Sequence, residues 1–245
     1  MRLAILSDLH ANGDALSAVV RALARHRPDR IYHLGDLTGY NAEPEVCVRW
    51  AMENTAGGVF GNHDAVACGR AKGRDFHEAA RKAALWSKDH LSGGSREYLA
   101  DLPPTLDAGG FALLVHGSPG DPDRYIYSID QAMEEMESPC SATADGPIFF
   151  GHTHVAGGFV RRKDGVVEHV PPGLFRLGEG ERALLNPGSV GQPRDRNPNA
   201  SFLVYDVSRR EVEWVRVPYD IEAARAKVLA AGLPSFFAER LRDGT

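Results

Sequence analysis

Five short polar motifs, each directly after an apolar stretch, contain the residues best suited to chemistry. In chain order they are Asp8-x-His10, Gly35-Asp36, Gly61-Asn62-His63-Asp64, His116-Gly117 and Gly151-His152-x-His154. Carboxylate and imidazole groups without any thiolate favour Mn, Fe, Zn, Co or Ni over a structural zinc site. Together the motifs offer more ligands than one ion can use. We therefore expect two divalent ions that share a carboxylate.

Two of the motifs have potential metal ligands at alternate positions. Alternate residues of a strand point to the same face, so Asp8 and His10 can hold one ion or two adjacent ions. The same argument applies to His152 and His154. Glycines beside the motifs allow the backbone to turn sharply where each strand ends.

The elements that must position these motifs can be predicted from hydrophobic patterning. Apolar stretches predict strands over residues 3–6, 30–34 and 57–60, and the segments 14–26 and 44–52 between them have helical signals. This alternation is typical of a parallel α/β sheet, in which ligands bind at the carboxyl ends of the strands. We expect the motifs to meet at that edge.

Beyond the third motif, helices and shorter strands are mixed. The predicted helices cover residues 75–91, 129–137 and most of 220–242, and the predicted strands, including a hairpin at Gly109-Gly110, cover 105–108, 111–115, 148–150, 155–160, 183–185, 201–205 and 212–217. No linker divides the chain, so we expect one domain over residues 1–245 with a helical insert at about 65–104. We expect this insert to form a lid or wall beside the ions, near Phe76 and Trp86.

Composition excludes several classes of protein. The 245 residues include 28 Lys and Arg against 33 Asp and Glu, so the formal charge is −5. This mild acidity, without a basic stretch interleaved with aromatics, argues against a nucleic-acid partner. No apolar run reaches the ~18 residues of a membrane helix. The three cysteines are far apart, so we expect no disulfide framework and a cytoplasmic location. The oligomeric state is left open.

The five motifs, in this order over residues 1–154, resemble those of the calcineurin-like metallophosphoesterases. The segment Asn186-Pro187-Gly188-Ser189 is also similar to one in small bacterial members of that family. The resemblance implies an α/β fold in which two sheets form a sandwich with helices on both outer faces. It also implies a small phosphate ester or nucleotide as substrate, and two divalent ions, of which Mn is the first expectation and Fe, Zn, Ni or Co are alternatives.

The resemblance also assigns the ligands. One metal would be held by Asp8, His10, Asp36 and His154, and the other by Asp36, Asn62, His116 and His152. Asp36 would bridge the ions together with a water or hydroxide. His63 would not bind metal but would face the scissile phosphate, where it is suited to protonate the leaving oxygen. The implied reaction is hydrolysis of a phosphodiester by in-line attack of the bridging hydroxide.

Two departures from the family pattern bear on the substrate. Serine/threonine phosphatases and bis-nucleoside polyphosphate hydrolases of the family carry Gly-Asp-x-x-Asp-Arg-Gly, whereas this chain has Gly39 and Tyr40 in place of the second Asp and the Arg. Loss of a phosphate-binding arginine favours a diester, which carries less charge. A phosphomonoesterase or nucleotide pyrophosphatase, including protein phosphatase-like activity, is the alternative. A non-catalytic scaffold is disfavoured because every ligand position and His63 are filled.

Four further residues lie in or near the motifs. Asn12 either caps the following helix or contacts phosphate, and Ser189 belongs to a turn that could bind product phosphate. Arg194 either guides an anionic substrate or is solvated in its loop. Asp64 has no family role, and we expect it to be structural.

Overall fold

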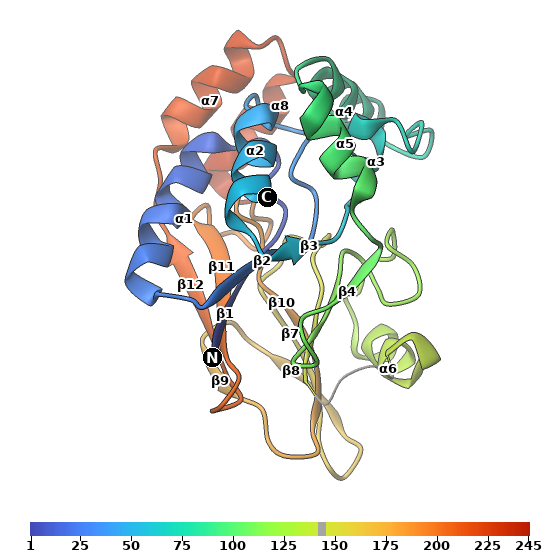
Figure 1. Cartoon of the computed structure of the whole chain (residues 1–245). Coiled ribbons are helices and arrows are strands. Elements are labelled where there is room, and N and C mark those ends of the chain that lie inside the picture. The colour runs from blue at the N-terminus through green and yellow to red at the C-terminus, as the bar shows by residue number, and fades with distance from the viewer. Residues whose placement is uncertain (142–145) are drawn as a thin grey trace.

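Two six-stranded sheets pack face to face, with helices on both outer faces (Figure 1). The computed structural model describes residues 1–141 and 146–245. The predicted α/β sandwich is confirmed. In the described residues, no helix has the length and apolarity that a membrane crossing requires.

The described helices and strands follow the predicted order closely. The helices are α1 (Gly13–His26), α2 (Pro44–Asn54), α3 (Asn62–Cys68), α4 (Glu78–Asp89), α5 (Gly93–Asp101), α6 (Ile129–Glu137), the 3-10 turn η1 (Pro139–Ser141), α7 (Ile221–Ala230) and α8 (Ser235–Asp243). The strands are β1 (Arg2–Leu6), β2 (Arg30–His33), β3 (Gly57–Gly58), β4 (Thr105–Asp107), β5 (Leu113–Val115), β6 (Ile148–Phe149), β7 (Gly157–Arg161), β8 (Val167–Val170), β9 (Leu174–Arg176), β10 (Arg182–Asn186), β11 (Ala200–Asp206) and β12 (Glu211–Val217).

Each sheet contains three parallel strands. The first sheet has the order β3-β2-β1-β11-β12-β9, in which β1, β2 and β3 are parallel. The second has the order β4-β5-β6-β10-β7-β8, in which β5, β6 and β10 are parallel. The polar motifs follow β1, β2, β3, β5 and β6, so both sheets send ligands from the carboxyl ends of parallel strands.

The core lies in layers on either side of the sheets. Between the sheets, Ile5 and Leu203 of the first pack with Phe149 and Leu185 of the second, and all four are fully buried. The outer face of the first sheet packs against α1 and α2, and the outer face of the second packs against α6. Burial of apolar surface on both faces of each sheet holds the strand ends in register.

The largest difference from prediction lies in the segment between the third and fourth motifs. The sequence predicts one helix over residues 75–91, but a second helix, α5, follows it. Ser92 caps α5, because its Oγ accepts a hydrogen bond from Ser95 N. Asn62 begins the short helix α3, which the hydrophobic patterning does not predict. The strands β8 and β9 were also missed. Each is short, and exposed residues interrupt its apolar pattern.

Candidate metal centre

The five motifs meet at one buried place. Potential metal ligands fall into three groups whose ligand atoms lie within 4.8 Å of one another: Asp8, His10 and His154; His10, Asp36 and His63; Asp36, His116 and His152. Asn62 follows β3 and lines a pocket with His63 and His152. The structure thus brings together every residue that the motifs nominate as a metal ligand.

Backbone hydrogen bonds tie the ligand loops to one another. His10 N donates to Asp36 O at 2.8 Å, and Gly151 N donates to His116 O at 2.7 Å. These bonds join loops of neighbouring parallel strands. Glycine is required beside them, because a Cβ atom on Gly61 would lie 2.0 Å from Oδ1 of Asp36. The ligand loops therefore form one connected layer.

Several expected ligands have strained backbone. Asp8, His10, Asp36, His152 and His154 all have positive φ, between 44° and 64°. This left-handed region costs a non-glycine residue roughly 1–2 kcal/mol. Such strain gathers at functional sites, where the surrounding structure imposes it.

Backbone carbonyls orient four histidines so that one ring nitrogen of each points to the centre of the cluster. His10 Nδ1 lies 2.8 Å from Thr38 O, His154 Nδ1 lies 2.6 Å from Gln192 O, and His116 Nδ1 lies 2.7 Å from Leu34 O. His152 Nε2 lies 3.1 Å from Asp123 O. A carbonyl accepts only, so each outer nitrogen carries a proton, and the inner nitrogen is the one available to a metal ion or to a second proton.

The inner nitrogens nevertheless approach closely in pairs. His10 Nε2 and His154 Nε2 are 3.1 Å apart, and His116 Nε2 and His152 Nδ1 are also 3.1 Å apart. Two lone pairs repel at this distance unless a positive charge lies near both. A proton or a metal ion supplies that charge.

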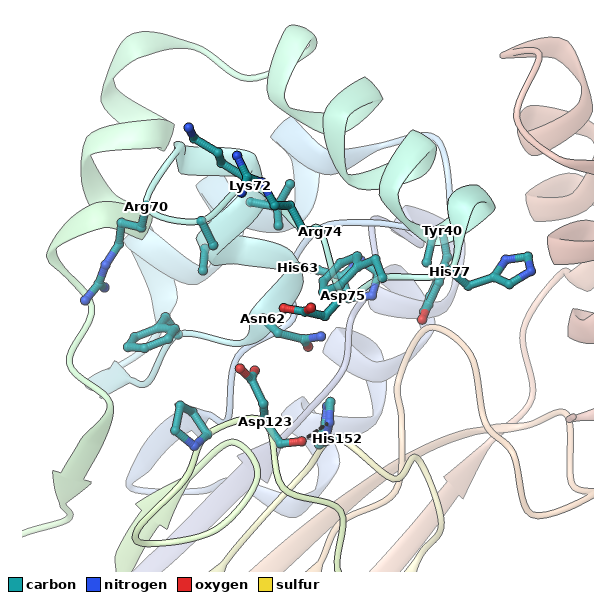
Figure 2. Close-up of a pocket in the computed structure, with 18 of the residues that line it drawn as sticks. Tyr40, Asn62, His63, Arg70, Lys72, Arg74, Asp75, His77, Asp123 and His152 are labelled. Carbon is teal, nitrogen blue, oxygen red and sulfur yellow. Dashed lines mark hydrogen bonds between the residues drawn. The ribbon is translucent and has the colours of Figure 1, made fainter.

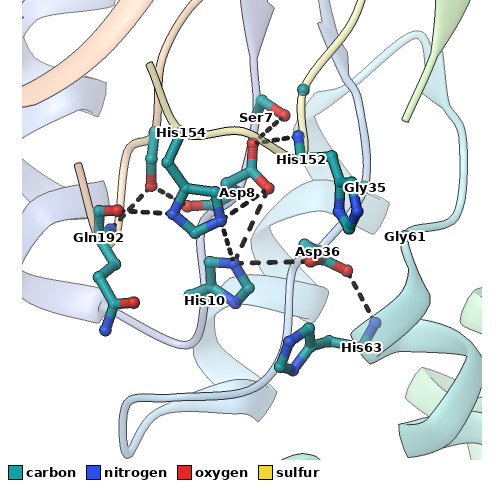
Figure 3. Close-up of polar contacts among 12 residues, drawn as sticks. Ser7, Asp8, His10, Gly35, Asp36, Gly61, His63, His152, His154 and Gln192 are labelled. Atoms are coloured by element: carbon teal, nitrogen blue, oxygen red, sulfur yellow. Dashed lines mark hydrogen bonds and ion pairs between the residues drawn. The ribbon is translucent and has the colours of Figure 1, made fainter. Parts of the chain in front are cut away.

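The two carboxylates complete the arrangement (Figure 3). Oδ2 of Asp8 accepts hydrogen bonds from Ser7 Oγ and His152 N, which leaves its buried Oδ1 without a hydrogen-bond donor, 3.3 Å from His154 Nε2. Oδ1 of Asp36 accepts a bond from His63 N, and Oδ2 lies 3.5 Å from Nε2 of both His10 and His116. One oxygen of each carboxylate is thus fixed by the protein and the other faces imidazoles.

Electrostatics favour a cation in this cluster. Burial raises the pKa of the Asp8 carboxyl to about 7, although His116 attracts its charged form. Burial opposes protonation of His116, but the charge of Asp36 and a hydrogen bond to it raise the pKa of His116 to about 10. Burial lowers the pKa of His10 and His154 well below the ordinary value, so both stay neutral ligands. The buried Oδ1 of Asn62 has no hydrogen-bond donor. With the carboxylates and imidazoles it forms a ligand set that fits divalent transition metals.

His63 lies beside the expected metal ligands, and aromatic side chains pack against its ring. Its ring contacts Tyr40, with centroids 4.5 Å apart, and Phe76, with centroids 4.7 Å apart. Its Nδ1 is buried beside Gly39 without a hydrogen-bond partner, which leaves Nε2 as the nitrogen available to the pocket. Burial lowers the pKa of His63 to about 4, so the ring is neutral near pH 7 in the free protein.

Asp64 is structural, as expected. Its buried carboxylate accepts hydrogen bonds from Leu37 N, Thr38 N and Thr38 Oγ1. Gly61 N also donates to it, within a capping box at the start of α3. These bonds hold the loop after β2 against the loop after β3.

The polar groups of Asn12 and Ser189 are hydrogen-bonded within the protein. Asn12 Oδ1 accepts from Ala15 N at the start of α1, and its Nδ2 donates to Gly191 O. Ser189 Oγ donates to Asp8 O at 2.7 Å and accepts from Gln192 N. Both side chains support the loop that carries Asp8.

Arg194 lies close to the cluster. Its Nη2 donates to the hydroxyl of Tyr40 at 3.1 Å, and its backbone N donates to His154 O. The Tyr40 ring in turn contacts His10, with centroids 4.3 Å apart. An arginine from a distant loop therefore stands next to the tyrosine that replaces the family's arginine.

A pocket of about 870 Å³ opens over Asn62, His63 and His152 (Figure 2). The motifs did not reveal its remaining walls, which include Asp123 and Tyr125 from the loop after β5. Tyr125 stacks on His152 with ring centroids 3.9 Å apart. The segment between α3 and α4 forms the facing wall and includes Phe76. Trp86 stacks instead on His90, away from the pocket lining.

Comparison with known proteins agrees with this geometry. Residues 1–210 match the Calcineurin-like phosphoesterase superfamily domain. The chain belongs to this superfamily. Its members are metal-dependent phosphoesterases, and the resemblance in the five motifs is confirmed over most of the chain.

Relatives of this calcineurin-like phosphoesterase match it over nearly its whole length. A metallophosphoesterase from Sphaerobacter thermophilus is 35% identical, with a TM-score of 0.86, and the match covers 100% of this chain and 99% of that one. An uncharacterized protein from Methanocaldococcus jannaschii is 32% identical over 98% of this chain and 96% of its own. A hypothetical protein from Pyrococcus horikoshii shares the fold, with a TM-score of 0.81 at 18% identity over 100% of this chain and 98% of that one.

Proposed function

We propose that this calcineurin-like phosphoesterase uses two divalent ions, Mn first among them, to hydrolyse phosphodiester bonds of a small cytoplasmic substrate. One ion would be held by Asp8, His10, Asp36 and His154, and the other by Asp36, Asn62, His116 and His152. The single observation that carries the proposal is the position of Asp36. Its Oδ2 lies 3.5 Å from the inner nitrogens of both His10 and His116, which belong to different ligand sets.

The roles of the side chains follow from their contacts. When bound, two divalent ions supply a hydroxide nucleophile near neutral pH and offset the charge of the phosphate oxygens. The carbonyls behind the four histidines hold each ring in the ligand tautomer. Burial of the cluster excludes water and strengthens these interactions.

His63 would handle the proton of the leaving group. Its Nε2 is the nitrogen available to the pocket, and a general acid there would protonate the leaving oxygen. Burial keeps its pKa at about 4 in the free protein. An anionic phosphate nearby would favour the charged imidazolium and raise that pKa, so we expect protonation to accompany substrate binding.

The preference for a diester rests on Asp123. Its carboxylate lies on the pocket wall between His152 and Asn62 (Figure 2). A carboxylate there repels a doubly charged monoester more than a singly charged diester.

A phosphomonoesterase is the second candidate, and Arg194 supports it. The family's arginine is replaced by Tyr40, but the guanidinium of Arg194 is hydrogen-bonded to that tyrosine. The absence of the family's arginine is therefore a weaker reason to prefer a diester. A cation near the site would help to bind a second phosphate charge.

The experiment that tests the function compares metal-stripped and Mn²⁺-loaded protein on bis(p-nitrophenyl) phosphate and p-nitrophenyl phosphate. We expect metal-dependent hydrolysis with higher kcat/KM on the diester. A higher value on the monoester would establish the second candidate. No hydrolysis of either, with two ions bound per chain, would contradict both.

A further inference from the structure

The hydroxyl of Tyr40 is a hydrogen-bond donor without an acceptor. An arginine side chain only donates, so the hydroxyl oxygen accepts the bond from Arg194 Nη2, 3.1 Å away, and the hydroxyl proton is left to donate elsewhere. Among the described residues, none accepts that proton, although only 9% of Tyr40 is exposed. Buried donors are nearly always paired, so an unpaired one that lines a pocket indicates that a ligand there accepts the bond.

Several contacts hold this hydroxyl in place. Arg194 Nη2 also lies 3.4 Å from Gln192 Oε1, and Arg194 N donates to His154 O. The guanidinium of Arg194 lies 5.5 Å from the centroid of the Tyr40 ring. The Phe237 ring of α8 also packs against Tyr40, with centroids 4.7 Å apart. A donor fixed in this way loses little conformational entropy when it binds a ligand.

Tyr40 lies beside both parts of the candidate metal centre. Its ring centroid lies 4.5 Å from that of His63, the expected acid. It lies 4.3 Å from that of His10 and 6.3 Å from that of His154, which are expected ligands of the same ion. Figure 2 shows Tyr40 on the helical side of the pocket, with its hydroxyl pointing toward the loops that follow the strands. The hydroxyl is therefore next to the place where a phosphate at the ions would lie.

The charges around Tyr40 favour donation to an anion. Burial raises the pKa of the phenol above its ordinary value, and Arg194 offsets this only in part, so the proton is present near neutral pH. The bond from the guanidinium draws electron density from the hydroxyl oxygen and makes the O–H group a stronger donor. An oxyanion is the acceptor that bonds most strongly to such a group.

We propose that the Tyr40 hydroxyl donates a hydrogen bond to a non-bridging oxygen of the substrate phosphate, while Arg194 holds and polarises that hydroxyl. Tyr40 is then a catalytic residue that touches the substrate, and Arg194 is a positioning residue that acts through it. This inference rests on the proposed function for the place of the phosphate.

Tyr40→Phe is the primary test, because it removes the hydroxyl and keeps the ring that contacts His10 and His63. Two quantities are measured on Mn²⁺-loaded protein at a fixed concentration of free Mn²⁺. They are kcat/KM on bis(p-nitrophenyl) phosphate and the dissociation constant of orthophosphate from calorimetric titration. We expect each to worsen by about tenfold or more, the usual size of one hydrogen bond to a charged group. Metal content and melting temperature should stay close to the wild-type values.

Tyr98→Phe is the matched control. It removes another partly buried hydroxyl, which lies 2.9 Å from His33 Nε2 and does not line the pocket. We expect kcat/KM and phosphate binding of this variant to equal those of the wild-type protein.

A double variant tests whether Arg194 acts through Tyr40. Arg194→Met removes the guanidinium and should lower kcat/KM, since the hydroxyl is then neither held nor polarised. The losses should not add, so Tyr40→Phe/Arg194→Met should resemble Tyr40→Phe alone. Additive losses would mean that Arg194 contacts the phosphate itself, and would overturn its positioning role.

The other outcomes are distinct. Unchanged kcat/KM and phosphate binding in Tyr40→Phe overturn the inference while the function stands. Loss of metal or a lower melting temperature in this variant assigns the hydroxyl to the fold and also overturns it. Absence of metal-dependent hydrolysis by the wild-type protein overturns the proposed function instead. The phosphate titrations then decide the inference, and equal affinity of the wild-type protein and Tyr40→Phe, or no binding to either, counts against it.

Discussion

A Cβ atom on Gly39 would lie 2.2 Å from Nδ1 of His63. Gly39 also has φ of +87°, a conformation that favours glycine. The position at which other family branches carry an aspartate is therefore occupied here by the His63 ring itself. Packing against Tyr40 and Phe76, and not a carboxylate, orients this histidine.

We expect Gly39→Ala to displace His63. The new methyl group cannot fit beside the ring, and alanine is strained at this φ, so kcat should fall by at least about tenfold and the melting temperature by several degrees. Bound metal should remain, since Gly39 is not a ligand. Gly94→Ala is the control, because no atom lies within 4 Å of its Cβ position in α5. Full activity of Gly39→Ala would contradict the packing argument.

Asp36→Asn tests the shared carboxylate. Asparagine preserves the size of the side chain but removes the charge placed between His10 and His116. We expect metal content, measured by atomic emission, to fall below two ions per chain. Activity should fall more than ~100-fold, since even partners behind a ligand contribute 10–100-fold. Asp101→Asn, exposed on α5, is the control. Two tightly bound ions in Asp36→Asn would argue against a bridging role.

His63→Ala separates proton transfer from metal binding. Both ions should stay bound, while kcat falls by roughly 10²–10⁴, the usual contribution of a general acid. The loss should be smaller for substrates that release p-nitrophenolate, which needs little protonation. The check is a series of diesters with leaving groups of increasing pKa. An equal loss across the series would exclude the acid role.

His33 predicts a pH dependence that is independent of metal. Burial lowers its pKa to about 3, against an ordinary 6.5. Between these values the unfolded chain binds a proton that the folded chain does not, so stability is lost as pH falls through this range. The slope is at most ~1.4 kcal/mol per pH unit. In metal-free protein, His33→Gln should show a shallower decrease in free energy of unfolding from pH 6.5 to 4.5, measured by urea denaturation. An identical slope would contradict this assignment.

The meeting of the expected ligands at one place could be predicted from sequence because its signals are local. The ligands, such as Asp36, follow the ends of apolar strands, several of them next to a glycine, and parallel strands place such ends together. The roles of Asn12 and Ser189 needed the structure. A side chain that caps a helix or supports a loop cannot be told from one that binds phosphate by sequence alone, because the difference lies in the atoms near it in space.

The walls of the pocket could not be predicted in the same way. Asp123 and Tyr125 belong to a loop with no periodic pattern, and Arg194 reaches Tyr40 across 154 residues of sequence. Such contacts depend on how loops pack, which composition and spacing do not specify. The helix α5 was missed for another reason, because Ser92 both follows one helix and caps the next.

The left-handed backbone at the ligand positions has a consequence for evolution. Glycine at His154, for example, would relieve the strain at φ of 60° and remove a ligand in one step. Activity and stability therefore select for different residues at these sites. A descendant released from catalysis is free to accept glycine there and gain stability. Glycine in place of a ligand residue would then indicate lost catalysis and could be recognised from sequence alone.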